Sequence, residues 1–171
     1  ASLQEDSLQV ASLFSEMDGV EAAYRNPDAA EGREQLKQTV MPLVEAVKKN
    51  LRKEELRLHF HRDPAVSFLR VWKDTWNDDL SGFRGTSFKV KGRRAPLRAI
   101  EGGRGGIAIR GIAPIIDKGE YLGSVELYTD PFELIPMLKR GRQNGMVLLV
   151  NSKVARELFF EADLADYFQG E

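Results

Sequence analysis

The sequence of 171 residues contains no cysteine. This absence excludes disulfide bonds and thiolate chemistry, but it leaves the compartment undecided because many periplasmic and cytosolic domains lack cysteine. An excess of either charge is also missing, since 25 lysines and arginines stand against 26 aspartates and glutamates. A nearly neutral chain is not expected to bind nucleic acid or an anionic membrane across a broad surface.

Three further absences narrow the function. No apolar run approaches the length of a membrane span, and no signal peptide is recognisable. The glycines between Gly102 and Gly106 precede a predicted strand instead of a helix, so they lack the helix end that a phosphate-binding loop requires. No serine lies in a nucleophile-elbow motif. We therefore predict no catalytic residue and no cofactor.

A long β-hairpin is the most regular feature of the sequence. Gly105–Ile116 and Tyr121–Tyr128 alternate with the period of strands, and Asp117–Gly119 suits a three-residue turn with its glycine in the left-handed conformation. The register that follows from this turn places Arg110 opposite Glu126. Two opposite charges are thus predicted on one face of two apolar strands.

Two amphipathic helices are predicted before the sheet. The first, Ser2–Tyr24, carries apolar residues at seven-residue intervals, a seam typical of a coiled coil or of a helix on its own domain. Both interpretations stay open, and we expect pairing with a second copy in a longer receptor. The second helix, Ala30–Leu51, should be kinked at Pro42. The seam of the first helix consists of Leu3, Val10, Leu13, Met17, Val20 and Tyr24.

Further strands and helices complete an α+β domain. Glu55–Arg62 and Ser67–Lys73 have the period of strands, and we divide the chain into a helical segment, residues 1–51, and a sheet module, residues 52–171. We predict one antiparallel sheet that contains both strands and the hairpin. The remaining predicted elements are a short helix at Asp79–Arg84, a strand at Phe88–Val90, a helix at Phe132–Arg140, a strand at Met146–Val150 and a helical or irregular tail at Lys153–Phe168.

The two histidines of the chain lie two residues apart on a predicted strand. His59 and His61 therefore project from the same face, where they would be workable metal ligands if Glu126 supplied a third donor. Two ligands without a fixed third are weak support for a metal. We favour hydrogen-bonded histidines or an organic ligand, and we assign no metal ligand.

Arg70 is flanked by two aromatic residues on its strand. A guanidinium held between Phe68 and Trp72 is oriented to bind a carboxylate with two hydrogen bonds. The alternative is an internal salt bridge to Asp78 or Asp79, and the sequence does not decide between them. In either case a buried arginine needs a carboxylate, from the protein or from a ligand.

Two stretches of the sequence resemble the Cache superfamily of extracytoplasmic sensor domains, in particular the double-Cache-like domains of bacterial chemoreceptors, sensor kinases and diguanylate cyclases. They are LHFHRDPAVSFLRVWKDTWNDDLSGFR, from Leu58 to Arg84, and GGRGGIAIRGIAPIIDKGEYLGSVE, from Gly102 to Glu126. The resemblance implies a PAS-like antiparallel sheet, a long N-terminal helix and a small-molecule pocket on one sheet face. The sequence departs from the family's pattern in holding one sensor module and in Arg62 and Asp63, which follow the His-x-His motif.

We therefore predict the periplasmic or extracytoplasmic ligand-binding domain of a bacterial membrane receptor. Because the chain begins at Ala1 without methionine, we interpret it as a piece of a longer protein whose membrane spans lie elsewhere. The expected ligand is a small anionic or zwitterionic molecule, and a metal-binding protein or metalloenzyme and a non-binding dimerisation module are the alternatives. The predicted site residues are His59, His61, Phe68, Arg70 and Trp72, followed by Phe83, Arg110 and Glu126.

Overall fold

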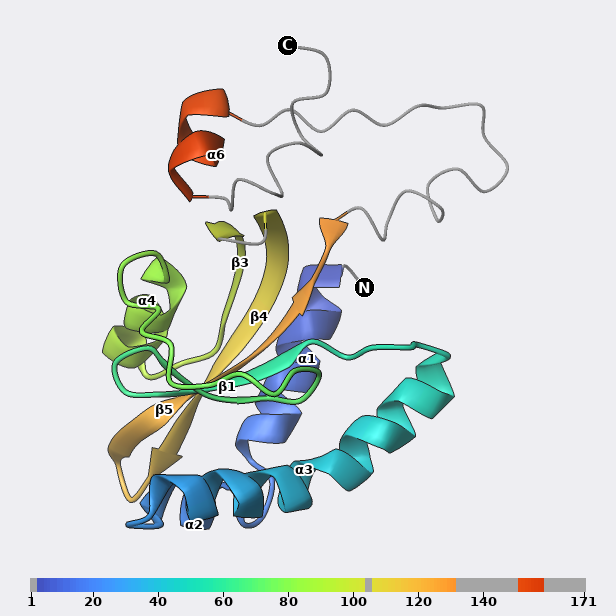
Figure 1. Cartoon of the computed structure of the whole chain (residues 1–171), viewed down its shortest axis with the longest axis vertical. Coiled ribbons are helices and arrows are strands. Elements are labelled where there is room, and N and C mark those ends of the chain that lie inside the picture. The colour runs from blue at the N-terminus through green and yellow to red at the C-terminus, as the bar shows by residue number, and fades with distance from the viewer. Residues whose placement is uncertain (1–2, 104–105, 132–150, 159–171) are drawn as a thin grey trace.

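The computed structural model of the chain describes residues 3–103, 106–131 and 151–158. Its strands form one antiparallel sheet in the order β2-β1-β5-β4-β3, so the predicted α+β class is confirmed (Figure 1). None of the described helices is long and apolar enough to cross a membrane. The strands are β1 Leu58–Arg62, β2 Val66–Arg70, β3 Leu97–Gly103, β4 Gly106–Asp117 and β5 Glu120–Thr129, and the helices are α1 Leu3–Ser15, α2 Val20–Arg25, α3 Ala29–Leu51, α4 Gly85–Arg93 and α6 Ser152–Leu158.

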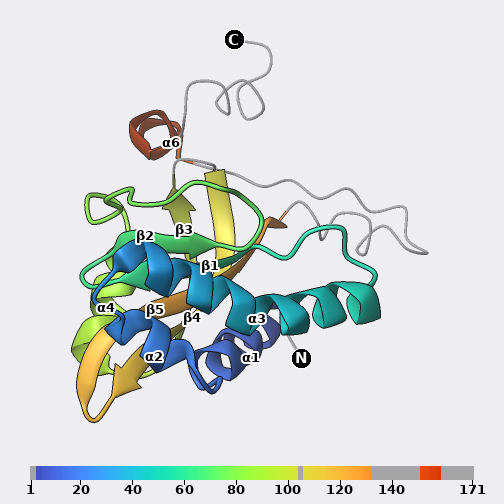
Figure 2. The ribbon, with the colours of Figure 1, turned by 60° about the horizontal axis from the view of Figure 1, so that its bottom comes forward.

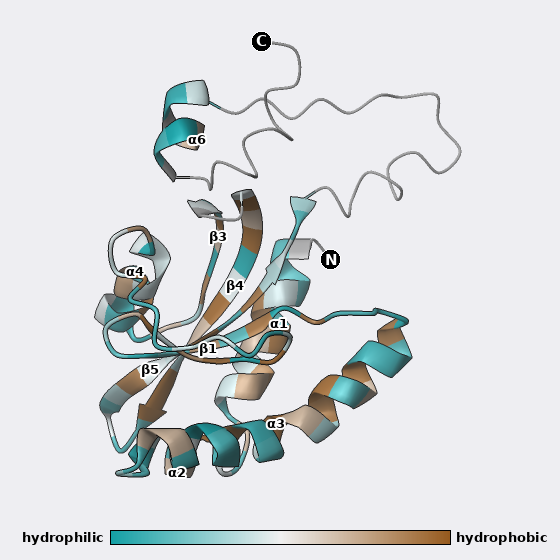
Figure 3. Cartoon of the chain, viewed as in Figure 1, coloured by the Kyte–Doolittle hydropathy of each residue, from teal (hydrophilic) through white to brown (hydrophobic). Residues whose placement is uncertain are grey.

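Helices α1, α2 and α3 gather on the same side of the sheet (Figures 1 and 2). Apolar side chains on that face of the strands, such as Phe60 and Val125, pack with Phe14 of α1 and Leu36 of α3 in one hydrophobic core. Figure 3 shows apolar and hydrophilic residues alternating along α3, as expected for a helix with one buried face. The three helices thus share a core with β1, β2, β4 and β5.

The first predicted helix is two helices. Helix α1 ends at Ser15, and α2 begins at Val20 after Gly19, whose φ of 90° lies outside the helical range. Because of this break, the apolar seam turns toward the protein's own core, where Val20 and Tyr24 are buried. Leu13 of the seam remains 67% exposed.

The second predicted helix is confirmed as α3. Its first turn is capped by Asp28, whose carboxylate accepts hydrogen bonds from the backbone amides of Ala30 and Glu31. Pro42 lies inside the helix, and Figure 1 shows α3 changing direction along its length.

The segment between β2 and the hairpin differs from the prediction. Residues Phe88–Val90 belong to α4 and not to a strand, and the residues of the predicted helix Asp79–Arg84 form a bridge and turns. A short apolar run fits either a strand or a helix, and here Val90 is buried against Ile112 on the far face of the sheet. The edge strand β3 was not predicted as a separate strand.

The hairpin is confirmed, with a different register. The turn contains two residues, Lys118 and Gly119, which have φ values of 50° and 79°, as in a type I′ turn. A shift in register between Ile115 and Ile116 then pairs Arg110 with Tyr128, so Arg110 is not directly opposite Glu126. Since the predicted and observed registers differ by two residues, each side chain keeps its face.

Of the elements predicted near the C-terminus, the described residues include only the start of the tail. The helix at Phe132–Arg140 and the strand at Met146–Val150 lie outside the described residues. Helix α6 falls at the start of the predicted tail, and Ala155 on it is buried.

Candidate functional site

The sheet face away from α1–α3 carries a cluster of buried polar side chains. Strand alternation explains their position, because His59 and His61 alternate with Leu58 and Phe60 of the core. Polar groups buried in such number need hydrogen bonds or opposite charges close by. Buried polar residues on or beside this face are His59, His61, Ser67, Arg84, Thr86, Ser87, Arg110, Ser124 and Glu126.

The two histidines contact each other and are each held by a serine. Nε2 of His61 lies 3.0 Å from Nδ1 of His59. The other ring nitrogens, Nε2 of His59 and Nδ1 of His61, lie 2.9 Å from Ser67 Oγ and 3.3 Å from Ser124 Oγ. Both rings are therefore fixed in orientation. Burial lowers the pKa of both histidines, well below 6.5 in His59, so both imidazoles are neutral at pH 7.

Glu126 faces the histidine pair from β5. Its Oε1 atom lies 3.4 Å from His59 Nδ1 and 3.5 Å from His61 Nε2, and its Oε2 atom accepts a hydrogen bond of 2.8 Å from Arg110 Nη1. Burial alone would raise the pKa of this carboxyl, but Arg110 and Arg84 hold it well below its ordinary value. Glu126 is therefore ionised, and among the described residues its Oε1 has no hydrogen-bond partner.

Two arginines and a second glutamate extend the cluster. Nη2 of Arg84 lies 3.9 Å from Glu126 Oε1, while Nη1 of Arg84 and Nε of Arg110 lie 4.0 Å and 3.6 Å from Glu101 Oε2. Thr86 holds Glu101 through its hydroxyl and backbone amide, at 2.7 Å and 3.1 Å. Within the described part of the chain, Arg84 Nε, Arg84 Nη1 and Arg110 Nε are buried without a hydrogen-bond partner. The two arginines therefore have hydrogen-bonding capacity that the described residues do not fill.

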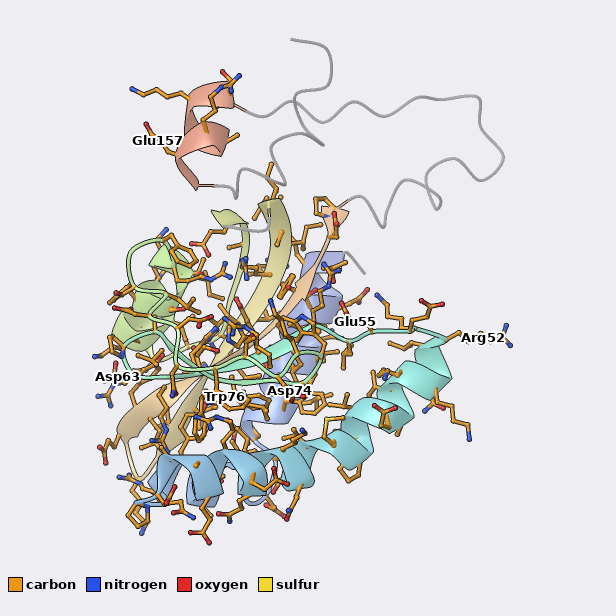
Figure 4. The ribbon with its side chains drawn as sticks, viewed as in Figure 1. Arg52, Glu55, Asp63, Asp74, Trp76 and Glu157 are labelled. Carbon is orange, nitrogen blue, oxygen red and sulfur yellow. The ribbon has the colours of Figure 1, made fainter. Side chains whose placement is uncertain are left out.

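A cavity of about 280 Å³ lies beside the two arginines. Arg84 and Arg110 contribute to its wall, together with the rings of Trp72 and Tyr128, which meet edge to face at 5.4 Å. Glu55, labelled in Figure 4 on the segment between α3 and β1, also lines it. A larger cavity, about 450 Å³, lies between α1 and that segment and contains none of the buried charged groups.

Arg70 makes the internal salt bridge that the sequence left open. Its guanidinium donates to the carboxylate of Asp78 at 2.6 Å and to both oxygens of Thr75, at 2.8 Å and 2.9 Å. The loop after β2 therefore already satisfies much of the binding capacity of this side chain.

The prediction that Phe68, Arg70 and Trp72 share a strand face is wrong. The register shifts opposite Phe60, which leaves Phe68 as an extra, unpaired residue of β2. Phe68 consequently packs in the core, edge to face with Tyr24 at 5.0 Å.

The structure thus gathers five of the eight predicted residues: His59, His61, Trp72, Arg110 and Glu126. Phe68 lies across the sheet, and Phe83 supports the Arg84 guanidinium, which is 5.3 Å from the centre of its ring. Sequence reasoning missed Arg84. The one signal was its position at the end of the Leu58–Arg84 motif, since strand periodicity does not extend into that turn.

Comparison with known families adds a further finding. A family model described as a double sensory domain of two-component sensor kinases matches residues 5–161, which is most of the chain. No curated protein matches the sequence.

Proposed function

The chain belongs to the family of double sensory domains of two-component sensor kinases, and on that premise we propose that it is the extracytoplasmic part of a bacterial membrane receptor. Its ligand is a small anionic or zwitterionic molecule that binds in the cavity beside Arg84 and Arg110. We propose no reaction at this site, and the output of the receptor lies in another part of it.

The observation that carries this proposal is the pair of arginines in the cavity wall, Arg84 and Arg110, whose guanidinium groups keep three N–H donors without a hydrogen-bond partner among the described residues. Buried N–H groups without a partner are costly, and a ligand carboxylate would satisfy them in a charge-assisted, two-pronged manner. Trp72 and Tyr128 offer flat apolar surface to the rest of such a ligand. Glu55 on the same wall favours a ligand that also carries a positive group.

The first test is a thermal-shift screen of the purified chain with free amino acids and short dicarboxylic acids. For the compound that raises the melting temperature most, replacing Arg84 with methionine should weaken affinity tenfold to hundredfold, corresponding to about 1.5–3 kcal/mol. Calorimetric titration measures this loss. The matched control is Arg25→Met, because Arg25 is half exposed and pairs with Asp117 far from the cavity. Equal affinity of the Arg84 variant and wild type, or a screen without a stabilising compound, would contradict the proposal.

We also propose that two copies associate through their N-terminal helices in the longer receptor. Among the seam residues whose burial the structure describes, Leu13 is the one left exposed, at 67%. Membrane tethering raises the effective concentration of two such helices. Leu13→Cys in the full-length receptor should therefore form disulfide dimers under oxidation, with exposed Gln35→Cys on α3 as control. Equal cross-linking at both positions would count against the pairing.

A further inference from the structure

We propose that His59, His61 and Glu126 form a binding site for a divalent transition metal, with Zn²⁺ as the ion that fits best. The proposal deepens the sensor function by assigning part of its ligand, but metal binding can be tested without it. Two imidazoles and one carboxylate are a common ligand set of zinc sites that keep one position open. The three residues are fully buried and come from the adjacent strands β1 and β5.

The spacing of the three donor atoms matches tetrahedral coordination. His59 Nδ1, His61 Nε2 and Glu126 Oε1 form a triangle with sides of 3.0, 3.4 and 3.5 Å. Ligands about 2.05 Å from one tetrahedral zinc ion lie roughly 3.3 Å apart. An ion at that distance from all three atoms would lie about 0.7 Å off their plane, close to the offset of a regular tetrahedron. The distances between the three donor atoms therefore already match those of a zinc site.

The outer contacts of the site are those that a metal ligand needs. The ring nitrogen of each histidine that points away from the triangle meets a serine hydroxyl, Ser67 for His59 and Ser124 for His61. Such partners fix the tautomer and the ring orientation of a ligating histidine. Arg110 holds the second oxygen of Glu126 in the same way.

The unpartnered Oε1 atom of Glu126 is the observation that points to a cation. When the N–H of one ring donates to the other ring across the 3.0 Å contact, that proton is directed at a ring nitrogen and not at Oε1. A metal ion satisfies all three donor atoms at once.

The donor set also selects the kind of ion. Imidazole nitrogen suits Zn²⁺ and its neighbours in the first transition series, whereas Mg²⁺ and Ca²⁺ prefer oxygen donors. Arg84 and Arg110 favour an anionic fourth ligand, such as hydroxide, chloride or the carboxylate of the molecule in the adjacent cavity. A receptor of this kind would recognise its ligand together with the metal.

The test uses the whole chain without an affinity tag, after dialysis against a chelator. Since His59 and His61 are the only histidines and cysteine is absent, surface imidazoles and thiols contribute no background. Calorimetric titration with ZnCl₂ should show one equivalent bound. Replacing either histidine with glutamine should weaken binding at least a hundredfold, and Ser124→Ala should weaken it tenfold to hundredfold. The control Ser87→Ala removes another buried hydroxyl, outside the triangle, and should leave zinc affinity unchanged.

A second measurement uses only the wild-type protein, so its result does not depend on whether a variant folds. In ¹⁵N spectra of the wild-type histidine rings, Zn²⁺ should shift Nδ1 of His59 and Nε2 of His61, which are opposite nitrogens of the two rings. Absence of stoichiometric binding, binding unaffected by the histidine variants, or shifts at the other two nitrogens would each overturn the metal site. If zinc fails to bind while a carboxylate still requires Arg84, the sensor function stands and the metal site falls. If zinc binds but no carboxylate does, the metal site stands and the proposed carboxylate ligand falls.

Discussion

Replacing Glu126 with glutamine is expected to lower the free energy of unfolding by about 3–5 kcal/mol. The side chain is fully buried, and its ionised carboxylate neutralises Arg110 at 2.8 Å and Arg84 at 3.9 Å. Glutamine has the same shape as glutamate but no charge. The two buried guanidinium groups of Arg84 and Arg110 would then have only one carboxylate nearby among the described residues, that of Glu101. Denaturant unfolding of chelator-treated protein, followed by the fluorescence of Trp72 and Trp76, measures the loss.

The control for this prediction is the same substitution on the same strand. Glu120 is 63% exposed and pairs with Arg25 at the surface, where an ion pair contributes at most about 1 kcal/mol. A double-mutant cycle with Arg110→Met should show strong coupling with Glu126→Gln and none with Glu120→Gln. If Glu126→Gln changed stability by less than about 1 kcal/mol, the charges of the cluster would not hold the fold together.

Replacing Gly111 with alanine is expected to lower the free energy of unfolding by about 3 kcal/mol, the upper end of the usual range for overpacking. A Cβ atom at this position of β4 would lie 2.1 Å from the backbone nitrogen of Leu8 and 2.2 Å from the carbonyl carbon of Ser7. These atoms belong to the backbone of α1 and cannot rotate away. The helix would have to move off the sheet and away from the core that it covers.

The control is Gly92→Ala in α4. No atom lies within 4 Å of a Cβ atom at Gly92, and alanine is the better helix former, so this variant should gain about 0.5–1 kcal/mol. Thermal and denaturant unfolding of the two variants should therefore give changes of opposite sign. A Gly111→Ala protein as stable as wild type would show that α1 does not need to approach the sheet this closely.

Local periodicity predicted the elements that are confirmed here. The alternation around His59 and His61 predicted β1, the apolar pattern with Pro42 predicted α3, and Gly119 predicted a left-handed turn residue. These signals depend only on residues that are neighbours in the chain, so they predict local structure correctly even when the fold is unknown. The predicted pairing of Arg110 with Glu126 on the hairpin is also correct, although the predicted register is wrong. A shift of two residues leaves Arg110 and Glu126 on one face, close enough to pair diagonally.

The errors arose where a backbone irregularity interrupts a regular pattern. The first helix ends at Ser15 inside an apparently continuous seam, and left-handed Gly19 separates it from α2. The irregularity at Phe68 turns its ring to the opposite face of the sheet. A bulge depends on how two strands pair, and that pairing is a long-range property. The run at Phe88–Val90 shows the same limit, because burial of Val90 against the sheet decided in favour of a helix.

By itself, the sequence determined the α+β class, the resemblance to a sensor family and the placing of His59, His61 and Glu126 on strand faces. Side-chain direction in a strand follows from position alone. Only the tertiary structure decided which residues meet. It places Arg84 against Glu126, commits Arg70 to Asp78, and brings three donor atoms to the spacing of a metal site. Such encounters depend on strand order and on loop paths between distant segments, which a local pattern does not encode.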